Sequence, residues 1–141
     1  MRLVWKLVAC VMRQGADGAE LLVVDRPHAG THIPIGTLVD GEAAETGALR
    51  EISESTGVTD VQVVRTLSTW ERHTLVNGVP VEQRWQVVEL RLTTVALDEW
   101  SHTTESGVAR CHWLRLDRFA IDSLHPAYGT FVELLLATRA G

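Results

Sequence analysis

Several features that mark specialised classes of protein are scarce in this 141-residue sequence. Its two cysteines, Cys10 and Cys111, stand far apart and form no Cys-x-x-Cys pair for a metal. We expect both to be buried thiols in a reducing compartment, hence a cytoplasmic location, with a disulfide as the unsupported alternative. No histidine cluster has the spacing of zinc ligands. No apolar run approaches the roughly 20 residues that a membrane helix needs, so no membrane association is expected.

Basic charge is also scarce, because 13 lysine and arginine residues face 18 aspartate and glutamate residues, for a formal net charge of −5. A general nucleic-acid binder normally shows a basic face, so no nucleic-acid polymer is expected as a partner. An acidic protein can still bind a small phosphorylated ligand, because a bound cation reverses the negative charge at the binding site. The first six residues include Lys6 and lack a small-residue cleavage pattern, which predicts a first strand rather than a signal peptide.

The length and an apolar share of 45% predict a single domain over residues 1–141. In residues 3–12 both the odd-numbered and the even-numbered positions are mostly apolar, as in a strand covered on both faces. Further strands are expected at residues 20–25, 35–40, 61–76, 79–92 and 108–116. Asn77-Gly78 is the strongest short signal for a β-hairpin, here between residues 61–76 and 79–92. Residues 26–34 and 93–107 are expected to be loops, and residues 117–124 a connector.

A first helix is expected over residues 43–55, with Ala48, Leu49 and Ile52 on its apolar side. Gly57 follows at the position that favours a positive φ. Gly47, inside the helix, costs about 1 kcal/mol relative to alanine, and a tolerated glycine is preferred over close packing as its explanation.

A second helix is expected from His125-Pro126 to residue 140, because proline suits a first helical turn. Its expected inward stripe consists of Phe131, Leu134, Leu135 and Thr138. The resulting order, β-β-β-α-β-β-β-α with an antiparallel hairpin inside it, predicts an α+β fold with a mixed sheet flanked by helices.

Acidic residues gather on the first of these helices. Glu51 and Glu54 are three positions apart, so their carboxylates project from one face, and Glu42 can reach the same region. Converging carboxylates become favourable when they hold a hard divalent cation such as Mg²⁺. Such an ion would indicate phosphoryl or pyrophosphate chemistry. The alternative is a solvated helix face whose acids pair with Arg50 and Arg65.

The segment from Gly36 to Val58 resembles the signature box of the Nudix hydrolases, which cleave nucleoside diphosphates linked to another group. That box reads Gly, five residues, Glu, seven residues, Arg-Glu, an aliphatic residue, any residue, Glu-Glu, any residue, Gly and an aliphatic residue. The matching residues are Gly36, Glu42, Arg50, Glu51, Ile52, Glu54, Gly57 and Val58. His32-x-Pro34-x-Gly36 also resembles the lead-in common in that family. The resemblance implies a Nudix-like α/β/α sandwich.

The resemblance further implies divalent-metal-dependent hydrolysis of a pyrophosphate bond, with Mg²⁺ as cofactor and Mn²⁺ as the alternative ion. Glu51 and Glu54 would be catalytic metal ligands, Glu54 the general base, and the backbone carbonyl of Gly36 would assist. The box residues with an implied structural role are Glu42, Arg50 and Gly57.

Ser55 departs from the box, which has a second glutamate there. Serine binds magnesium poorly, so we expect weaker metal binding and less capacity for base catalysis. Glu105 is a candidate replacement ligand, and a surface charge is the equally compatible explanation of that residue. Ser55 also motivates the alternative function, a catalytically weak or inactive Nudix-fold module that binds a nucleotide or a partner protein.

Two further residues are candidates for contact with a small nucleotide-type substrate. Arg26 ends a predicted strand just before the box, and its guanidinium suits phosphate oxygens, although a solvated strand end fits equally well. His32 lies in the loop before the box and offers hydrogen bonds. His102, Trp70, Trp85 and Trp100 could each either contact a ligand or have a purely structural role, and the sequence leaves this open. The β-rich edges are compatible with a homodimer, and the oligomeric state stays open.

Overall fold

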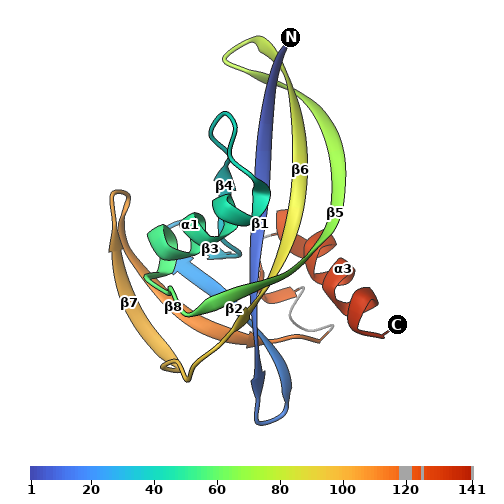
Figure 1. The fold of residues 1–141 in the computed structure, drawn as a ribbon. Helices are drawn as coiled ribbons and strands as arrows, with labels where there is room; N and C mark the ends of the chain where they lie inside the picture. Colours follow the sequence, from blue (N-terminus) through green and yellow to red (C-terminus); the bar gives the residue numbers. More distant parts are fainter. Residues whose placement is uncertain (118–121, 125, 141) are drawn as a thin grey trace.

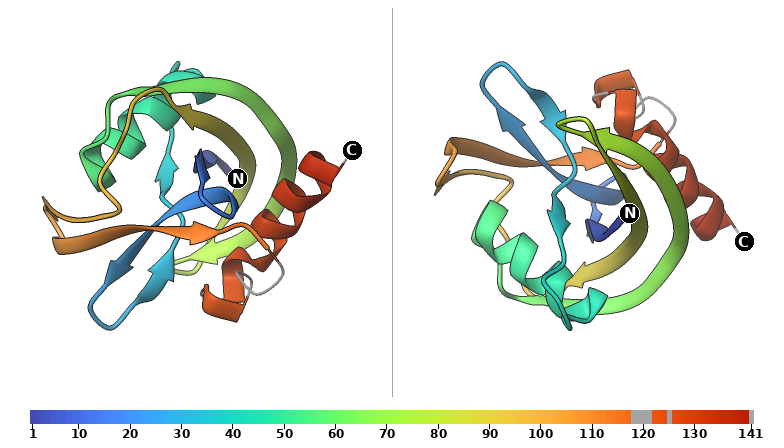
Figure 2. Two further views of the ribbon diagram at one scale, coloured as in Figure 1. Left: turned by 90° about the horizontal axis from the view of Figure 1, so that it is seen from below. Right: turned by 90° about the horizontal axis from the view of Figure 1, so that it is seen from above.

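The computed structural model describes residues 1–117, 122–124 and 126–140. His125 and residues 118–121 of the expected connector lie outside the described residues. A mixed sheet runs through the molecule, with one helix packed on each of its faces (Figures 1 and 2). The strands are β1 (Arg2–Gly15), β2 (Gly18–Arg26), β3 (Gly30–His32), β4 (Ile35–Thr37), β5 (Val61–Val76), β6 (Val79–Leu92), β7 (Glu99–Thr104) and β8 (Gly107–Arg115). The helices are α1 (Ala44–Thr56), the 3₁₀ turn η1 (Pro126–Tyr128) and α3 (Gly129–Ala140).

Strand β1 is the centre of this sheet, whose main order is β5-β6-β1-β2-β8-β7, with β3 beside β2 and β4 beside β1. It runs parallel to β6 and antiparallel to β2 and β4. The sheet is therefore mixed, as predicted.

Both faces of β1 are covered, which confirms the expectation from its apolar pattern. The side chains from Leu7 to Val11 have no exposed surface. Val8 and Cys10 belong to the core under α3, where Phe131 and Leu135 lie. Leu7 and its same-face neighbours belong to the core under α1. Both cysteines are free and buried, as expected.

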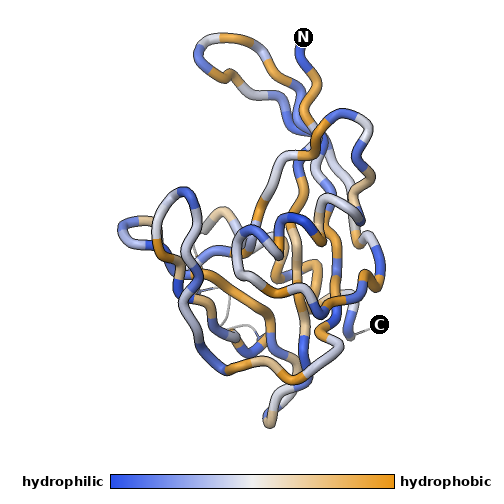
Figure 3. Tube along the Cα trace, turned by 60° about the vertical axis from the view of Figure 1, so that its left-hand side comes forward, coloured by the Kyte–Doolittle hydropathy of each residue, from blue (hydrophilic) through white to orange (hydrophobic). Residues whose placement is uncertain are grey.

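The β5–β6 hairpin forms where Asn77-Gly78 predicts it, and both residues have positive φ, 51° and 78°. This is the backbone geometry that two-residue hairpin turns require. The hairpin and the first residues of β1, which pair with β6 from Arg2 onward, extend together beyond the other strands (Figure 1). Its far end carries apolar positions (Figure 3), where Leu75 is 69% exposed.

Two expected loops contain strands. Residues 93–107 were expected to be a loop, but β7 (Glu99–Thr104) pairs with β8. In this edge strand five of the six residues are polar and exposed residues alternate with half-buried ones. It therefore lacks the apolar residues from which strands are predicted, and only tertiary contacts reveal it. Strand β3 likewise occupies the middle of the expected loop at residues 26–34. At residues 35–40 the extended segment is shorter than expected and ends at Thr37.

Helix α1 has the predicted extent to within one residue at each end. Ala48 and Ile52 are fully buried, but Leu49 is 40% exposed, so its inclusion in the apolar side was wrong. Gly47 is closely packed. A Cβ there would lie 2.2 Å from Leu38 Cδ2 and 2.9 Å from Leu7 Cδ2, which overturns the preferred explanation of a merely tolerated glycine.

Helix α3 buries Phe131 and Leu135 as expected, while Val132, absent from the expected stripe, is fully buried too. Among the described residues, no helix is long and apolar enough to cross a membrane.

Candidate active site

The C-terminal turn of α1 is held by side chains from β7. Gly57 ends the helix with φ 78°. The indole Nε1 of Trp100 donates to the Thr56 carbonyl at 2.8 Å, and His102 Nε2 lies 3.1 Å from the Glu54 carbonyl. These contacts satisfy carbonyls that a helix end leaves without partners. His102 and Trp100 thus have structural contacts here.

Arg50 joins the helix to the segment before it. Its Nε and Nη2 donate to the two carboxylate oxygens of Glu42 at 3.0 and 2.9 Å, and Nη2 also donates to the Thr37 carbonyl at 3.1 Å. Hydrogen bonds from Arg50 hold the pKa of Glu42 below its ordinary value. Arg65, the other suggested partner of the acidic helix, instead lies 3.5 Å from Glu89 on β6.

Glu51 points from α1 toward β4. Its Oε1 accepts a 2.7 Å hydrogen bond from the hydroxyl of Ser55. Its Oε2 lies so close to Gly36 that a Cβ at that glycine would be 2.6 Å away. Burial raises the pKa of Glu51, the nearby charge of Glu54 raises it further, and the Ser55 hydrogen bond opposes both effects. The carboxylate is therefore half-desolvated and close to a second negative charge.

Two cavities share Arg26, Glu51 and Ser55 among the residues that line them. The larger has a volume of about 540 Å³. Its other lining residues are Glu54, Thr103, Thr104, Glu105 and Ser106. The smaller has a volume of about 200 Å³ and is also lined by Val24, Ala29, His32, Ile33, Pro34, Ile35 and Tyr128. The two cavities are thus neighbours, and between them they are lined by Arg26, His32, Glu51, Glu54 and Glu105, which the sequence suggested as site residues.

Glu54 and Glu105 border the larger cavity from two different elements, α1 and the turn between β7 and β8. The Glu54 side chain is 62% exposed, and its Oε2 lies 3.4 Å from Arg50 Nη1. Glu105 is exposed in the turn between β7 and β8. In the part of the chain that the structure describes, no three ligand atoms in this cavity lie within 4.8 Å of one another. Glu105 is thus close enough to line the cavity but does not converge with Glu51 and Glu54.

These donors fit a hydrated magnesium ion. Mg²⁺ commonly keeps several waters and uses one or two protein carboxylates together with substrate phosphates. Glu51 and Glu54 supply two carboxylates whose mutual repulsion a cation would relieve. The close approach of Glu51 to Gly36 also requires the missing Cβ at that position. The cavity therefore offers oxygen ligands and room for water.

The smaller cavity contains a residue that the sequence did not indicate. The ring nitrogen Nδ1 of His32 lies 3.1 Å from the hydroxyl of Tyr128, and their rings meet edge to face. Tyr128, in η1, belongs to the core under α3 and also lines this cavity. His32 and Tyr128 are far apart in the sequence, so their contact could be found only from the fold. The one sequence signal was that Tyr128 is the single tyrosine of the chain.

The tryptophans left open by the sequence have structural contacts. Trp70 and Trp85 stack at 5.8 Å between ring centroids, and both pack against Phe131. Trp100 packs with the core under α1. Among the described residues lining the two cavities there is no tryptophan.

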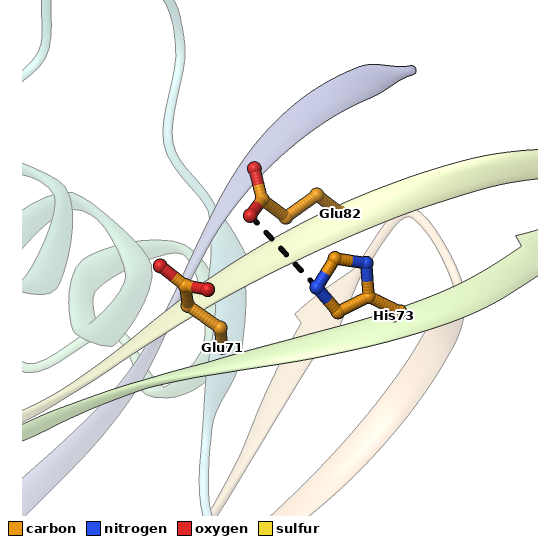
Figure 4. Close-up of side chains that lie close together, drawn as sticks. All are labelled: Glu71, His73 and Glu82. Carbon is orange, nitrogen blue, oxygen red and sulfur yellow. Dashed lines mark ion pairs between the residues drawn. The ribbon is translucent and has the colours of Figure 1, made fainter.

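A second group of potential metal ligands lies on the β5–β6 hairpin (Figure 4). It comprises Glu71, His73 and Glu82, whose ligand atoms lie within 4.8 Å of one another. Arg84 contacts both carboxylates, at 3.6 Å from Glu71 and 3.7 Å from Glu82. The Arg84 guanidinium therefore already supplies positive charge to these carboxylates. We interpret the group as a solvated ion-pair network.

The fold and the larger cavity define an α+β domain in which a carboxylate-bearing helix packs on a mixed sheet. A family model described as the NUDIX domain matches residues 5–135, and the chain therefore belongs to the Nudix family. Among curated protein sequences there is no match to this chain.

Solved structures show the same fold at low sequence identity. An Ap4A hydrolase binary complex from C. elegans has a TM-score of 0.65 and 18% identity, covering 100% of this chain and 99% of that one. The MutT protein from Methanosarcina mazei Go1 has a TM-score of 0.65 and 16% identity, covering 99% and 97%. A NUDIX hydrolase from Nitrosomonas europaea has a TM-score of 0.65 and 19% identity, covering 97% and 90%. The Nudix-like α/β/α arrangement is thus confirmed.

Proposed function

We propose that this protein hydrolyses a pyrophosphate bond in a nucleoside diphosphate linked to another moiety, with Mg²⁺ or Mn²⁺ as cofactor. The observation that carries this proposal is the larger cavity, where Glu51 and Glu54 of α1 face the same space as Arg26 of β2. Carboxylates suit a hard cation, and a guanidinium suits phosphate oxygens. Membership of the Nudix family supports the same reaction class.

In this proposal, Glu51 and Glu54 hold the ion with help from the Gly36 carbonyl. When bound, the cation would supply Lewis-acid polarisation of a phosphoryl oxygen. Glu54, the more exposed carboxylate, accepts the proton of the attacking water. Glu105, which lines the same cavity from the turn between β7 and β8, is the candidate for an additional ligand through water.

Arg26 and His32 are the proposed substrate contacts. Arg26 lines both cavities, so its guanidinium can meet phosphate oxygens that extend from one to the other. His32 lines the smaller cavity, which is suited to the group beyond the phosphates. We therefore propose a small nucleotide as the partner rather than a nucleic-acid polymer; the cytoplasmic location stays a prediction from the sequence.

The structural residues of the signature have a proposed role in placing α1. The bidentate contact between Arg50 and Glu42 ties the helix to the segment that follows β4. Gly57 ends the helix directly after the turn that carries Glu54.

A catalytically weak or inactive module that binds a nucleotide or a partner protein is the second candidate. Ser55 favours it, because a hydroxyl occupies the position of a signature carboxylate and lines both cavities. The two candidates differ in whether substrate is turned over.

Glu54→Gln tests the enzymatic proposal. The substrate panel comprises nucleoside diphosphate derivatives and Ap4A, which is included because an Ap4A hydrolase is a structural neighbour. We expect the unchanged protein to show Mg²⁺-dependent product release, and the variant to lose about 100-fold or more in kcat because it lacks a general base. The matched control is Glu45→Gln, an exposed acid in the first turn of the same helix, which should retain activity.

Absence of turnover on the whole panel with Mg²⁺ and with Mn²⁺ would favour the binding module. An active enzyme that tolerates Glu54→Gln would instead require a different base.

A further inference from the structure

We propose that Ser55 is a positioning residue that holds Glu51 in the orientation for metal binding; this inference rests on the proposed role of Glu51 as a ligand. In the signature pattern Ser55 is a lost carboxylate. In the structure its hydroxyl donates to Glu51 Oε1 at 2.7 Å, one helical turn away. The departure from the pattern therefore replaces a ligand with a hydrogen-bond donor.

The two oxygens of Glu51 are held from different sides. Ser55 is only 5% exposed, and its hydroxyl contacts Oε1, whereas Oε2 lies against Gly36. A hydrogen bond to a charged acceptor is stronger and more directional than one between neutral groups. Glu51 consequently keeps one side-chain orientation before any ligand arrives, and the ordering cost is paid on folding rather than on binding.

A hydroxyl suits this position because the neighbourhood already carries two negative charges. Glu51 and Glu54 are close enough for their charges to interact. A third carboxylate at the buried position 55 would add repulsion in the metal-free protein and could not, while ionised, donate to Glu51. Serine provides the donor without that charge, and Arg26, which lines the same two cavities, remains available to substrate phosphates.

The test is the Mn²⁺ affinity of the full chain, measured by electron paramagnetic resonance from the loss of the free-ion signal. We expect Ser55→Ala to weaken binding about 10-fold or more, the usual effect of removing a group that orients a metal ligand. The matched control is Ser53→Ala, the same change two residues earlier on α1, where the serine lines neither cavity. Ser53→Ala should stay within about twofold of the unchanged protein.

A Mg²⁺ titration of the reaction rate separates positioning from a general structural effect. Ser55→Ala should raise the apparent KM for Mg²⁺ while kcat at saturating Mg²⁺ largely recovers, because Glu51 and Glu54 are still present. A crystal structure of metal-free Ser55→Ala should show the Glu51 carboxylate displaced from Gly36.

The outcomes that overturn the proposal differ from those that overturn the metal site itself. If Ser55→Ala binds Mn²⁺ like the unchanged protein while Glu51→Gln does not, or if Glu51 keeps its orientation in the variant, Ser55 has no positioning role and the metal site stands. If the unchanged protein binds no Mn²⁺, or Glu51→Gln binds it normally, the proposed metal site and the role of Ser55 both fail.

Discussion

Arg50 and Glu42 form the best-connected polar pair at the base of α1. Three of the Arg50 hydrogen bonds go to Thr37, the last residue of β4, and to Glu42, on the segment between β4 and the helix. Glu42 also accepts from the Val39 amide at 3.3 Å. The pair therefore shapes the chain that leads into the helix, and its charge state should affect stability.

Glu42→Gln should lower the melting temperature at neutral pH and have little effect in acid. The pKa of Glu42 is held below its ordinary 4.5 in the folded protein, so its stabilising effect is present above pH 4.5 and disappears as pH falls through the folded-state value. Thermal melts of both proteins across pH 3 to 8 measure this difference. Glu45→Gln removes an exposed acid from the first turn of α1. Its melting temperature should differ little from that of the unchanged protein at every pH. A pH-independent difference would mean that shape rather than charge matters at Glu42.

At the scale of elements, the close approach of α1 to the sheet depends on Gly47. The nearest atoms to a Cβ at this position belong to Leu38, Leu7 and Glu42, and Leu7 is fully buried. A larger residue would push the helix away from β1, and with it the carboxylates that line the cavity.

Gly47→Ala should destabilise the protein although alanine is the better helix former. The gain in helix propensity is about 1 kcal/mol, whereas overpacking costs typically about 1–3 kcal/mol. We expect a net loss of about 1 kcal/mol in urea denaturation. Thr46→Ala, at the exposed neighbouring position, should change stability by less than about 0.5 kcal/mol. A stabilised Gly47→Ala would show that Leu38 moves aside without cost.

The elements that sequence predicts well are those with strong local signals. The apolar alternation of β1, Asn77-Gly78 and the Gly57 stop each depend on neighbouring residues, and the structure confirms them. Strand β7 and the packing around Gly47 depend on contacts between distant segments, and there the sequence prediction was wrong. Site residues divide in the same way. Glu51 and Glu54 were proposed from the signature pattern and Arg26 from its place at the end of a strand before it, whereas the contacts of Ser55 and Tyr128 required the fold.

At the scale of the whole molecule, metal binding should raise thermal stability. A ligand at 100 times its dissociation constant stabilises the folded state by about 2.7 kcal/mol. For a domain of this size that corresponds to roughly 8 °C in melting temperature. We expect this increase on moving from a chelator to saturating Mg²⁺, and Glu51→Gln should abolish it.

Glu71→Gln is the matched control for this measurement, because it removes a carboxylate from the hairpin group. It should leave the metal-dependent increase unchanged. If Glu71→Gln abolishes the increase and Glu51→Gln does not, the ion binds on the hairpin instead. The sequence leaves the choice between monomer and homodimer open, and light scattering decides it against the 15.6 kDa chain mass.

The attachment of β7 to the end of α1 has a consequence for motion. Trp100 and His102 bind the helical turn that carries Glu54, and the turn of the hairpin they belong to contains Glu105, which lines the same cavity. We therefore expect the β7–β8 hairpin and the end of α1 to move together. Local unfolding would likewise involve the strand and the helix end as one cooperative unit.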